Sequence, residues 1–302
     1  MNDIVYIDRA SGKEHIEKVY GKALIEALYG TSLFSKILSF LFLSILSRSN
    51  VISFLWCSFQ KSRLSQFKVK PFIQAFNVDP SEFLDPVESF KCFNDFFIRK
   101  LKPSCRPIVP GEKKAILPAD ARYLVYDNIK TVSGFLIKGH KFSLEELLLD
   151  SHLAQKYTSG SMVIARLAPV DYHRFHFPID CTPSKPQLIS GRLYSVNPTA
   201  LKKDINILTR NKRMITTLSS KTFGDVLYIE VGATNVGSIH QTFSPKKWQS
   251  KGDEKGYFSF GGSCLIILFE PSKIKFDQDL LDASSRKIEV LGKLGQSLGT
   301  AL

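Results

Sequence analysis

The sequence predicts an α+β protein in which an N-terminal helical region precedes a β-rich, barrel- or sandwich-like core. Up to about residue 100, apolar residues recur mainly at helical spacing. A connector at 102–113, rich in proline and carrying a glycine, then leads into short β-rich runs separated by turn residues. We therefore expect two parts, residues 1–100 and residues 101–302.

The first expected helix covers about residues 12 to 28. Ser11 and Glu14 have the spacing of a capping box, and apolar residues follow at helical spacing from Ile16 to Leu28. Further helices are expected in the apolar window that follows and at 87–101. In that last segment Phe90, Phe93 and Phe97 would share one face.

The expected strands follow the connector. They lie within 123–129, 160–169, 187–196, 213–220, 225–234 and 257–270. One helix interrupts them near 144–150, where Ser143 and Glu146 form a second capping box. Strands of this length and spacing are typical of a closed or sandwich-like β core rather than of βαβ units.

The net charge of +13 is concentrated in one window. Residues 27–78 contain no Asp or Glu but six basic residues: Lys36, Arg48, Lys61, Arg63, Lys68 and Lys70. Within it the apolar run 37–46 is too short to span a bilayer, which takes about 20 residues. We expect an interfacial helix on anionic lipid, with an ordinary buried helix as the alternative. Nucleic acid is a poorer partner, because the basic residues alternate with aliphatic runs.

Two compositional signals are negative. The run 37–46 lies too far from the N-terminus, behind too acidic a leader, to be a signal peptide. The five cysteines are scattered without a C-x-x-C pair, which argues against a disulfide framework and against a metal site. We therefore expect no metal and a reducing compartment.

Three segments hold candidate catalytic residues. Residues 166–180 contain His173 and His176 among aromatics, whose packing would shift the pKa values of the imidazoles; structural histidines are the alternative. Asp120 follows a short apolar run at 116–122 and could orient a histidine or cap its own turn. Ser263 follows Gly261 and Gly262 in a strand-like segment. It lacks a G-x-S-x-G elbow, and the nearest carbonyl for its hydroxyl to attack is that of Gly262.

Taken together, these segments resemble the phosphatidylserine decarboxylases, which are pyruvoyl-dependent and self-cleaving. The similar blocks occur in order: FFIRKLKPSCRPI, LPADAR, IKGHKFSLEELL, ARLAPVDYHRFHFPID, GRLYSVNP, VGATNVGSI and YFSFGGSCLIILFEP. The resemblance covers at least residues 90–271. One position departs from the family pattern, because Cys264 stands where Thr or Ser usually follows the reactive serine.

The resemblance implies a self-cleaving proenzyme. Asp120 would orient His176, which would take the proton of Ser263 before its oxygen attacks Gly262. Cleavage would leave a β chain (1–262) and an α chain (263–302) that begins with a pyruvoyl cofactor. That cofactor would decarboxylate phosphatidylserine to phosphatidylethanolamine and CO2 through a Schiff base, with His173 as candidate proton donor.

The resemblance also implies a setting for the enzyme. We expect a homodimer attached peripherally to the cytoplasmic face of a bacterial cell membrane through residues 27–78. Two alternatives stay open. One is a catalytically inactive lipid-binding homologue, and the other is a serine hydrolase that uses Asp120, His176 and Ser263.

Overall fold

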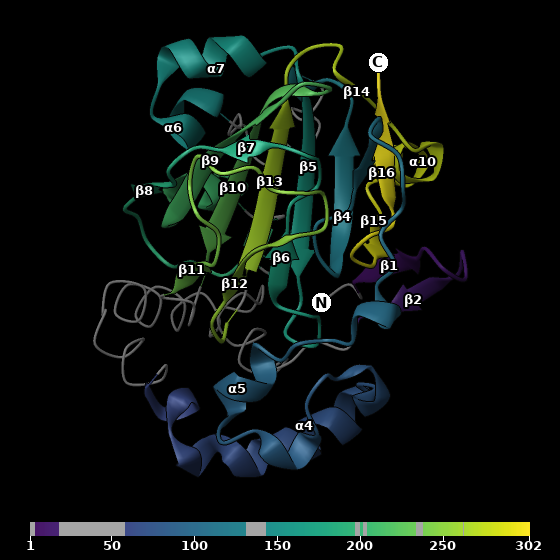
Figure 1. The fold of residues 1–302 in the computed structure, drawn as a ribbon, viewed down its shortest axis with the longest axis vertical. Helices are drawn as coiled ribbons and strands as arrows, with labels where there is room; N and C mark the ends of the chain where they lie inside the picture. The colour runs from purple at the N-terminus through teal and green to yellow at the C-terminus, as the bar shows by residue number, and fades with distance from the viewer. Residues whose placement is uncertain are drawn as a thin grey trace, which may run out of the picture.

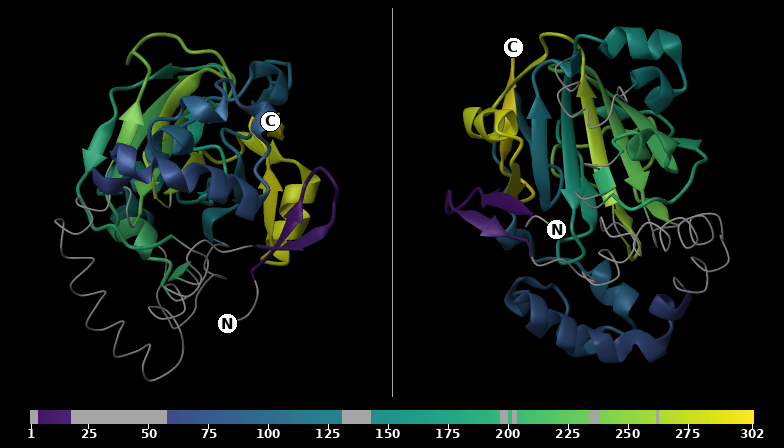
Figure 2. Two further views of the ribbon diagram at one scale, coloured as in Figure 1. Left: turned by 90° about the horizontal axis from the view of Figure 1, so that it is seen from below. Right: turned by 180° about the vertical axis from the view of Figure 1, so that it is seen from behind.

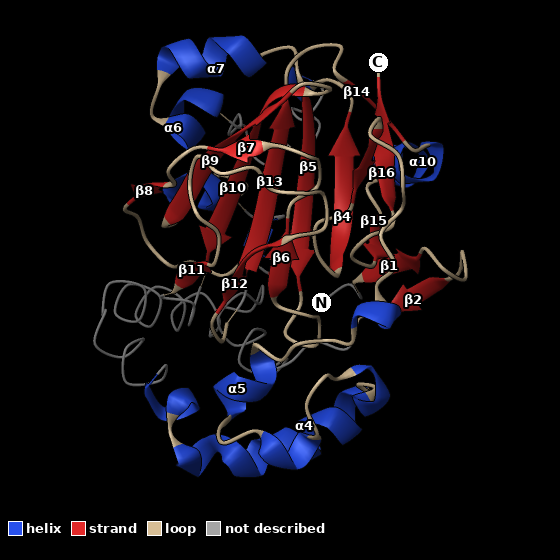
Figure 3. Cartoon of the chain, viewed as in Figure 1, coloured by secondary structure: helices blue, strands red, loops and turns tan. Residues whose placement is uncertain are grey.

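Our computed structural model describes residues 4–17, 58–130, 143–196, 200–201, 204–233, 238–261 and 263–302. These residues form an α+β fold dominated by sheet (Figures 1 and 3). The strands are β1 Val5–Asp8, β2 Glu14–Ile16, β3 Lys114–Ile116, β4 Ala121–Tyr126, β5 Ser161–Leu167, β6 Arg174–His176, β7 Thr182–Pro183, β8 Gln187–Ile189, β9 Arg213–Ser220, β10 Gly224–Gly232, β11 Ile239–Gln241, β12 Glu254–Phe258, β13 Ser263–Phe269, β14 Ile274–Phe276, β15 Glu289–Gly292 and β16 Ser297–Ala301. The α-helices are α4 Val69–Phe76, α5 Phe93–Phe97, α6 Leu144–Leu148, α7 Ser151–Tyr157, α9 Ile207–Arg210 and α10 Gln278–Ser285. Short 3-10 helices are η1 Arg63–Lys68, η2 Pro80–Glu82, η3 Val87–Ser89 and η4 Pro103–Cys105.

The largest sheet has ten strands and is open. Its order is β2-β1-β15-β4-β5-β13-β10-β9-β7, and β8 also pairs with β9. Two three-stranded sheets, β11-β12-β6 and β14-β16-β3, accompany it. The α+β class is therefore confirmed, whereas the expected barrel closure is wrong for the described part of the chain, whose sheet ends at β2 and β7.

The ten-stranded sheet is covered on both faces. Along β13 the side chains of Leu265, Ile267 and Phe269 enter one core, which also contains Phe175 and residues of α10. Cys264, Ile266 and Leu268 enter a second core, which contains residues of α6, α7 and α9. Because successive side chains alternate between two buried faces, the strand reads as a continuous apolar run.

A helical layer formed by η1, α4 and α5 lies beyond one end of the large sheet (Figures 1 and 2). It is held together by aromatic packing, in which Phe72 contacts Phe93 and Phe96 edge-on at ring-centroid distances of 5.3 and 5.6 Å. Phe260, from the segment just before β13, belongs to the same apolar cluster. The helical layer therefore contacts the chain directly upstream of Ser263.

The predicted helix at 12–28 is wrong at its start. Residues 14–16 form β2, which pairs antiparallel with β1, while β1 pairs parallel with β15. The Asp8 carboxylate accepts hydrogen bonds from the Ala10 N–H and the Ser11 hydroxyl, so Ser11 closes a turn rather than capping a helix. Residues 18–28 and the apolar run 37–46 lie outside the described residues.

Most of the other predicted helices and strands are confirmed. The helix near 144–150 is confirmed as α6, in which the Glu146 N–H donates to Ser143 Oγ at 3.2 Å. Every predicted strand segment contains a strand, although 187–196 keeps only β8. The helix expected at 87–101 is confirmed only as the short α5, and α7, α9 and α10 were not predicted. No helix among the described residues is long and apolar enough to cross a membrane.

A fully buried ion pair joins the large sheet to the β11-β12-β6 sheet. Lys255 Nζ of β12 donates to Glu230 of β10, to Thr216 Oγ1 at 3.0 Å and to Gln241 Oε1 at 2.9 Å. Burial raises the pKa of Glu230 and lowers the pKa of Lys255, and the close contact opposes both shifts. The second carboxylate oxygen of Glu230 has no hydrogen-bond partner among the described residues.

We predict that Lys255→Met lowers the free energy of unfolding by about 3–5 kcal/mol, because it leaves the Glu230 carboxylate buried without a counter-charge. The double variant Glu230→Met/Lys255→Met should be at least as stable as the parent, because no charge is then buried at positions 230 and 255. Urea denaturation followed by fluorescence measures both, in a Ser263→Ala background that keeps one covalent chain. A double variant as unstable as the single one would contradict this account.

Candidate active site

Ser263 is the first residue of β13 and is completely buried. Its backbone pairs with Gly232 of β10 on one side and with Leu167 of β5 on the other. Its side chain lies on the face of Leu265, two residues further along the strand. Pairing on both sides fixes the face of the sheet that the Ser263 side chain enters.

His173 faces that hydroxyl. Its Nδ1 lies 3.4 Å from Ser263 Oγ, and its Nε2 lies 3.0 Å from the Ala168 carbonyl oxygen. Because a carbonyl oxygen only accepts, Nε2 must carry the hydrogen, which leaves Nδ1 as an acceptor toward the serine. Burial, helped by the nearby Arg99 cation, lowers the pKa of His173 well below 6.5, so the ring is neutral at pH 7.

The loop that carries His173 is braced from two directions. The Phe97 ring of α5 stacks on the imidazole, with ring centroids 3.7 Å apart and an interplanar angle of 21°. The Asp171 carboxylate accepts the Ala168 N–H at 2.6 Å and pairs with Arg122 of β4. The Asp171 N–H also donates to the Ala168 carbonyl oxygen at 2.9 Å, so Asp171 holds both backbone groups of Ala168, whose carbonyl sets the tautomer of His173.

His176 makes different contacts. Its Nδ1 lies 2.8 Å from the Gly252 carbonyl oxygen, and its Nε2 lies 3.4 Å from the Tyr172 hydroxyl. Burial lowers the pKa of His176 as well. The two histidines are three residues apart in an extended segment, so their side chains point to opposite sides. His173 is the one that contacts Ser263.

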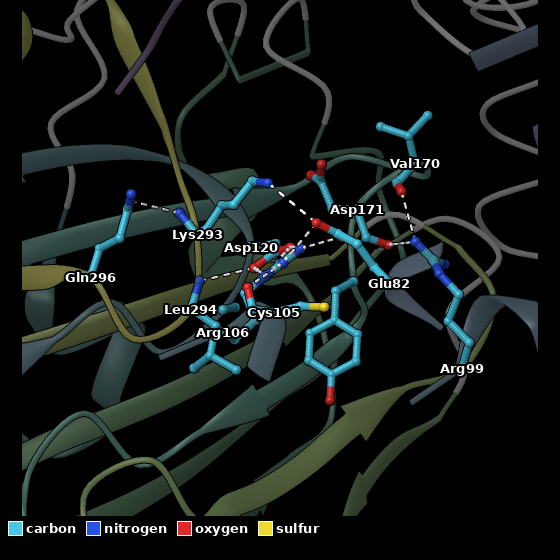
Figure 4. A network of polar contacts seen from close by, with 12 residues as sticks. Glu82, Arg99, Cys105, Arg106, Asp120, Val170, Asp171, Lys293, Leu294 and Gln296 are labelled. Atoms are coloured by element: carbon cyan, nitrogen blue, oxygen red, sulfur yellow. Dashed lines mark hydrogen bonds and ion pairs between the residues drawn. The ribbon is translucent and has the colours of Figure 1, made fainter. Parts of the chain in front are cut away.

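Asp120 is held by a cation rather than by a histidine. Its carboxylate accepts from Arg106 Nε at 2.9 Å and from the Leu294 N–H at 2.9 Å, while Arg106 also binds Glu82 (Figure 4). Among the described residues, no hydrogen bond joins Asp120 to His176 or His176 to Ser263. The expected relay is therefore not the arrangement in this structure, and Gly262 lies outside the described residues.

Sequence reasoning missed three contributors to the site. The Ala168 carbonyl is a backbone group and has no signature in the sequence. Phe97 was predicted only to share a helix face with Phe90 and Phe93, and Arg122 was part of a quoted motif but had no assigned role. Asp171, three residues after Ala168, has the spacing of a side chain that caps its own loop, which is the one usable signal.

Cys264 lies on the opposite face of β13 from Ser263. Its thiol is buried in the second core, where burial raises its pKa to about 12. The departure from the family pattern therefore places sulfur away from the imidazole of His173. Among the described residues, no group of three His, Cys, Asp or Glu side chains could hold a metal ion.

A completely buried serine that faces a neutral, backbone-oriented histidine is suited to a reaction on the protein's own chain, because neither group is exposed to solvent. The family model for phosphatidylserine decarboxylase matches residues 93–299. The phosphatidylserine decarboxylase proenzyme of Chlamydia muridarum is 49% identical over 256 residues, 85% of each chain. Two further proenzymes of this name match a larger share of the chain. That of Chlamydia pneumoniae is 46% identical over 294 residues, which are 97% of this chain and 96% of the relative. That of Chlamydia caviae is 45% identical over 310 residues, which are 100% of this chain and 99% of the relative. The chain belongs to the phosphatidylserine decarboxylase family.

Proposed function

We propose that this chain is the proenzyme of a phosphatidylserine decarboxylase, which cleaves itself between Gly262 and Ser263 and then converts phosphatidylserine to phosphatidylethanolamine and CO2. Family membership supports the activity. The observation that carries the self-cleavage is the contact between His173 Nδ1 and Ser263 Oγ. Because His173 is neutral and its Nε2 is already occupied, Nδ1 is free to accept the serine proton.

The cleavage follows from that proton transfer. As His173 takes the hydroxyl proton, Ser263 Oγ attacks the Gly262 carbonyl carbon, the C–N bond breaks and the nitrogen of residue 263 takes up a proton. Loss of the α-hydrogen of residue 263 then breaks the bond between Cβ and Oγ of that residue, and the oxygen leaves as part of the Gly262 carboxylate. The resulting dehydroalanine tautomerises and adds water, and ammonia leaves, so that residue 263 becomes a pyruvoyl group.

The buried start of β13 fits such a group, because a base faces it and little water reaches it. A pyruvoyl group supplies the carbonyl that draws off electrons as CO2 leaves its substrate. We also assign His173 to return a proton to the substrate carbon that loses CO2 in that second reaction. His176 is assigned a positioning role through its contacts with the Gly252 carbonyl and the Tyr172 hydroxyl.

The α chain stays bound after cleavage, because its strands pair with strands of the β chain. Strand β13 lies between β5 and β10, and β15 lies between β1 and β4. Asp120 adds a link, since it belongs to the β chain and accepts the Leu294 N–H of the α chain. We therefore assign Asp120 to holding the two chains together.

The test of this function is the intact mass of the purified protein. We expect two chains, 1–262 and 263–302, with the shorter one beginning in pyruvoyl, and production of CO2 from phosphatidylserine vesicles. Ser263→Ala should remain one intact, inactive chain. A wild-type chain that stays intact with an ordinary serine would overturn the proposal. Labelling of Ser263 by a serine-directed reagent would then favour a serine hydrolase. Lipid binding without such labelling would favour a catalytically inactive homologue.

The two histidines provide a matched pair for the mechanism. We predict that His173→Ala slows self-cleavage by at least 100-fold, because no other base contacts Ser263 among the described residues. His176→Ala should cleave within about tenfold of the wild-type rate. A gel time course of freshly translated protein measures both, and faster cleavage by the His173 variant than by the His176 variant would reverse the assignment.

We also propose that the helical layer contacts an anionic membrane. On η1, Leu64 and Phe67 are 73% and 70% exposed, and Lys61 and Arg63 stand beside them in the chain. Exposed apolar side chains flanked by cations are suited to a headgroup layer. Residues 27–57 of the basic window lie outside the described residues. The homodimer and the cytoplasmic face of the membrane are parts of this proposal that depend on the resemblance alone.

We predict that Leu64→Glu/Phe67→Glu reduces binding to anionic vesicles at least fivefold, because it places two carboxylates in the proposed contact surface. Leu188→Glu is the matched control, since Leu188 is also exposed, at 53%, but lies on β8. Sedimentation with phosphatidylglycerol vesicles measures the bound fraction. Equal loss in both variants, or no loss in the first, would remove η1 from the membrane contact.

A further inference from the structure

The segment just before Ser263 is held at two points. Ser263 is fixed by the strand pairing of β13, and Phe260 is fixed by the helical layer. Only Gly261 and Gly262 separate the two points. Gly261 has φ +143°, a backbone conformation that favours glycine. The position of the scissile peptide therefore depends on how firmly Phe260 is held.

Asn94 of α5 makes the polar part of that hold. Its side chain is 7% exposed, and its Oδ1 accepts the Phe260 N–H at 3.0 Å. The Phe260 ring packs edge-on between Phe93 and Phe97, at centroid distances of 5.2 and 5.0 Å. The same helix thus supplies a hydrogen bond and two aromatic contacts to one residue.

Helix α5 also holds the base. Phe97, which contacts Phe260, stacks on the His173 imidazole. The helix itself is tied to η1, where Ser65 Oγ accepts the Phe93 N–H at 2.9 Å. The base and the chain upstream of the scissile bond are therefore aligned by one rigid element.

We propose that Asn94 is a positioning residue for self-cleavage, acting through Phe260 on the carbonyl that Ser263 attacks. This inference depends on the proposed self-cleavage. The attack needs the reacting atoms about 3–3.5 Å apart and aligned, and a misplacement of about 1 Å can cost roughly 100-fold in rate. Decarboxylation takes place at residue 263 after the bond to Gly262 has broken, so it does not need the Asn94 contact.

Two substitutions of Asn94 that keep four side-chain heavy atoms, branched at Cγ, separate positioning from packing. Asn94→Asp keeps an oxygen acceptor for the Phe260 N–H, whereas Asn94→Leu removes it. We expect Asn94→Leu to slow self-cleavage at least tenfold, and Asn94→Asp to stay within about threefold of the wild type. Chains that are eventually cleaved should decarboxylate phosphatidylserine at the wild-type rate per pyruvoyl group in both variants.

The experiment is a chase after cell-free translation of the full chain, with cleavage followed on gels and pyruvoyl counted by mass spectrometry. Thermal unfolding of each variant in a Ser263→Ala background controls for folding. Cleavage of Asn94→Leu at the wild-type rate would overturn the inference, and so would equal slowing of Asn94→Asp and Asn94→Leu. Failure of the wild type to cleave would refute the proposed function instead.

Discussion

The burial of β13 on both faces and along both edges is the constraint on which the rest of the structure depends. The strand lies between β5 and β10, with one core above it and another below. A serine at its first position is fixed in place, kept from water and directed to one face. That same burial would hold the α chain after the proposed cleavage at Gly262, because its apolar side chains and ladder hydrogen bonds do not depend on that bond. A strand cleaved at its own start needs this much pairing to stay in the sheet.

Burial also sets the protonation state of His173, the proposed base. An exposed histidine would be partly protonated near pH 6.5, whereas His173 is kept neutral by desolvation. The Ala168 carbonyl fixes its tautomer, and Asp171 holds Ala168 in place by accepting its N–H and donating to its carbonyl oxygen. Arg122 joins Asp171 to Glu17, so the end of the β1–β2 hairpin is linked to the loop that carries the base.

Much of this could be predicted from the sequence, and the failures have identifiable physical causes. The strands were predictable because their apolar runs are short and bounded by turn residues. The Ser11–Glu14 spacing wrongly predicted a helix start, because a capping box and a tight turn use the same residue types. The choice between them depends on the pairing of β1 with β15, nearly 280 residues away in the chain. At the site, Ser263 followed from its motif, but the choice between His173 and His176 depends on which side of the extended segment 173–176 lies toward Ser263. The Ala168 carbonyl is common to every residue type and has no sequence signal.

The placement of the helical layer suits the proposed reaction on a phospholipid. A phospholipid keeps its acyl chains in the bilayer, so its headgroup can reach residue 263 only if the reactive end of β13 is near the membrane surface. In this structure α5 contacts Phe260 and His173 on one side and is tied to η1, with its exposed Leu64 and Phe67, on the other. One short helix therefore separates the proposed membrane contact from the reactive serine. A helical layer at the other end of the strands would keep the same cores and leave the serine out of reach of an anchored lipid.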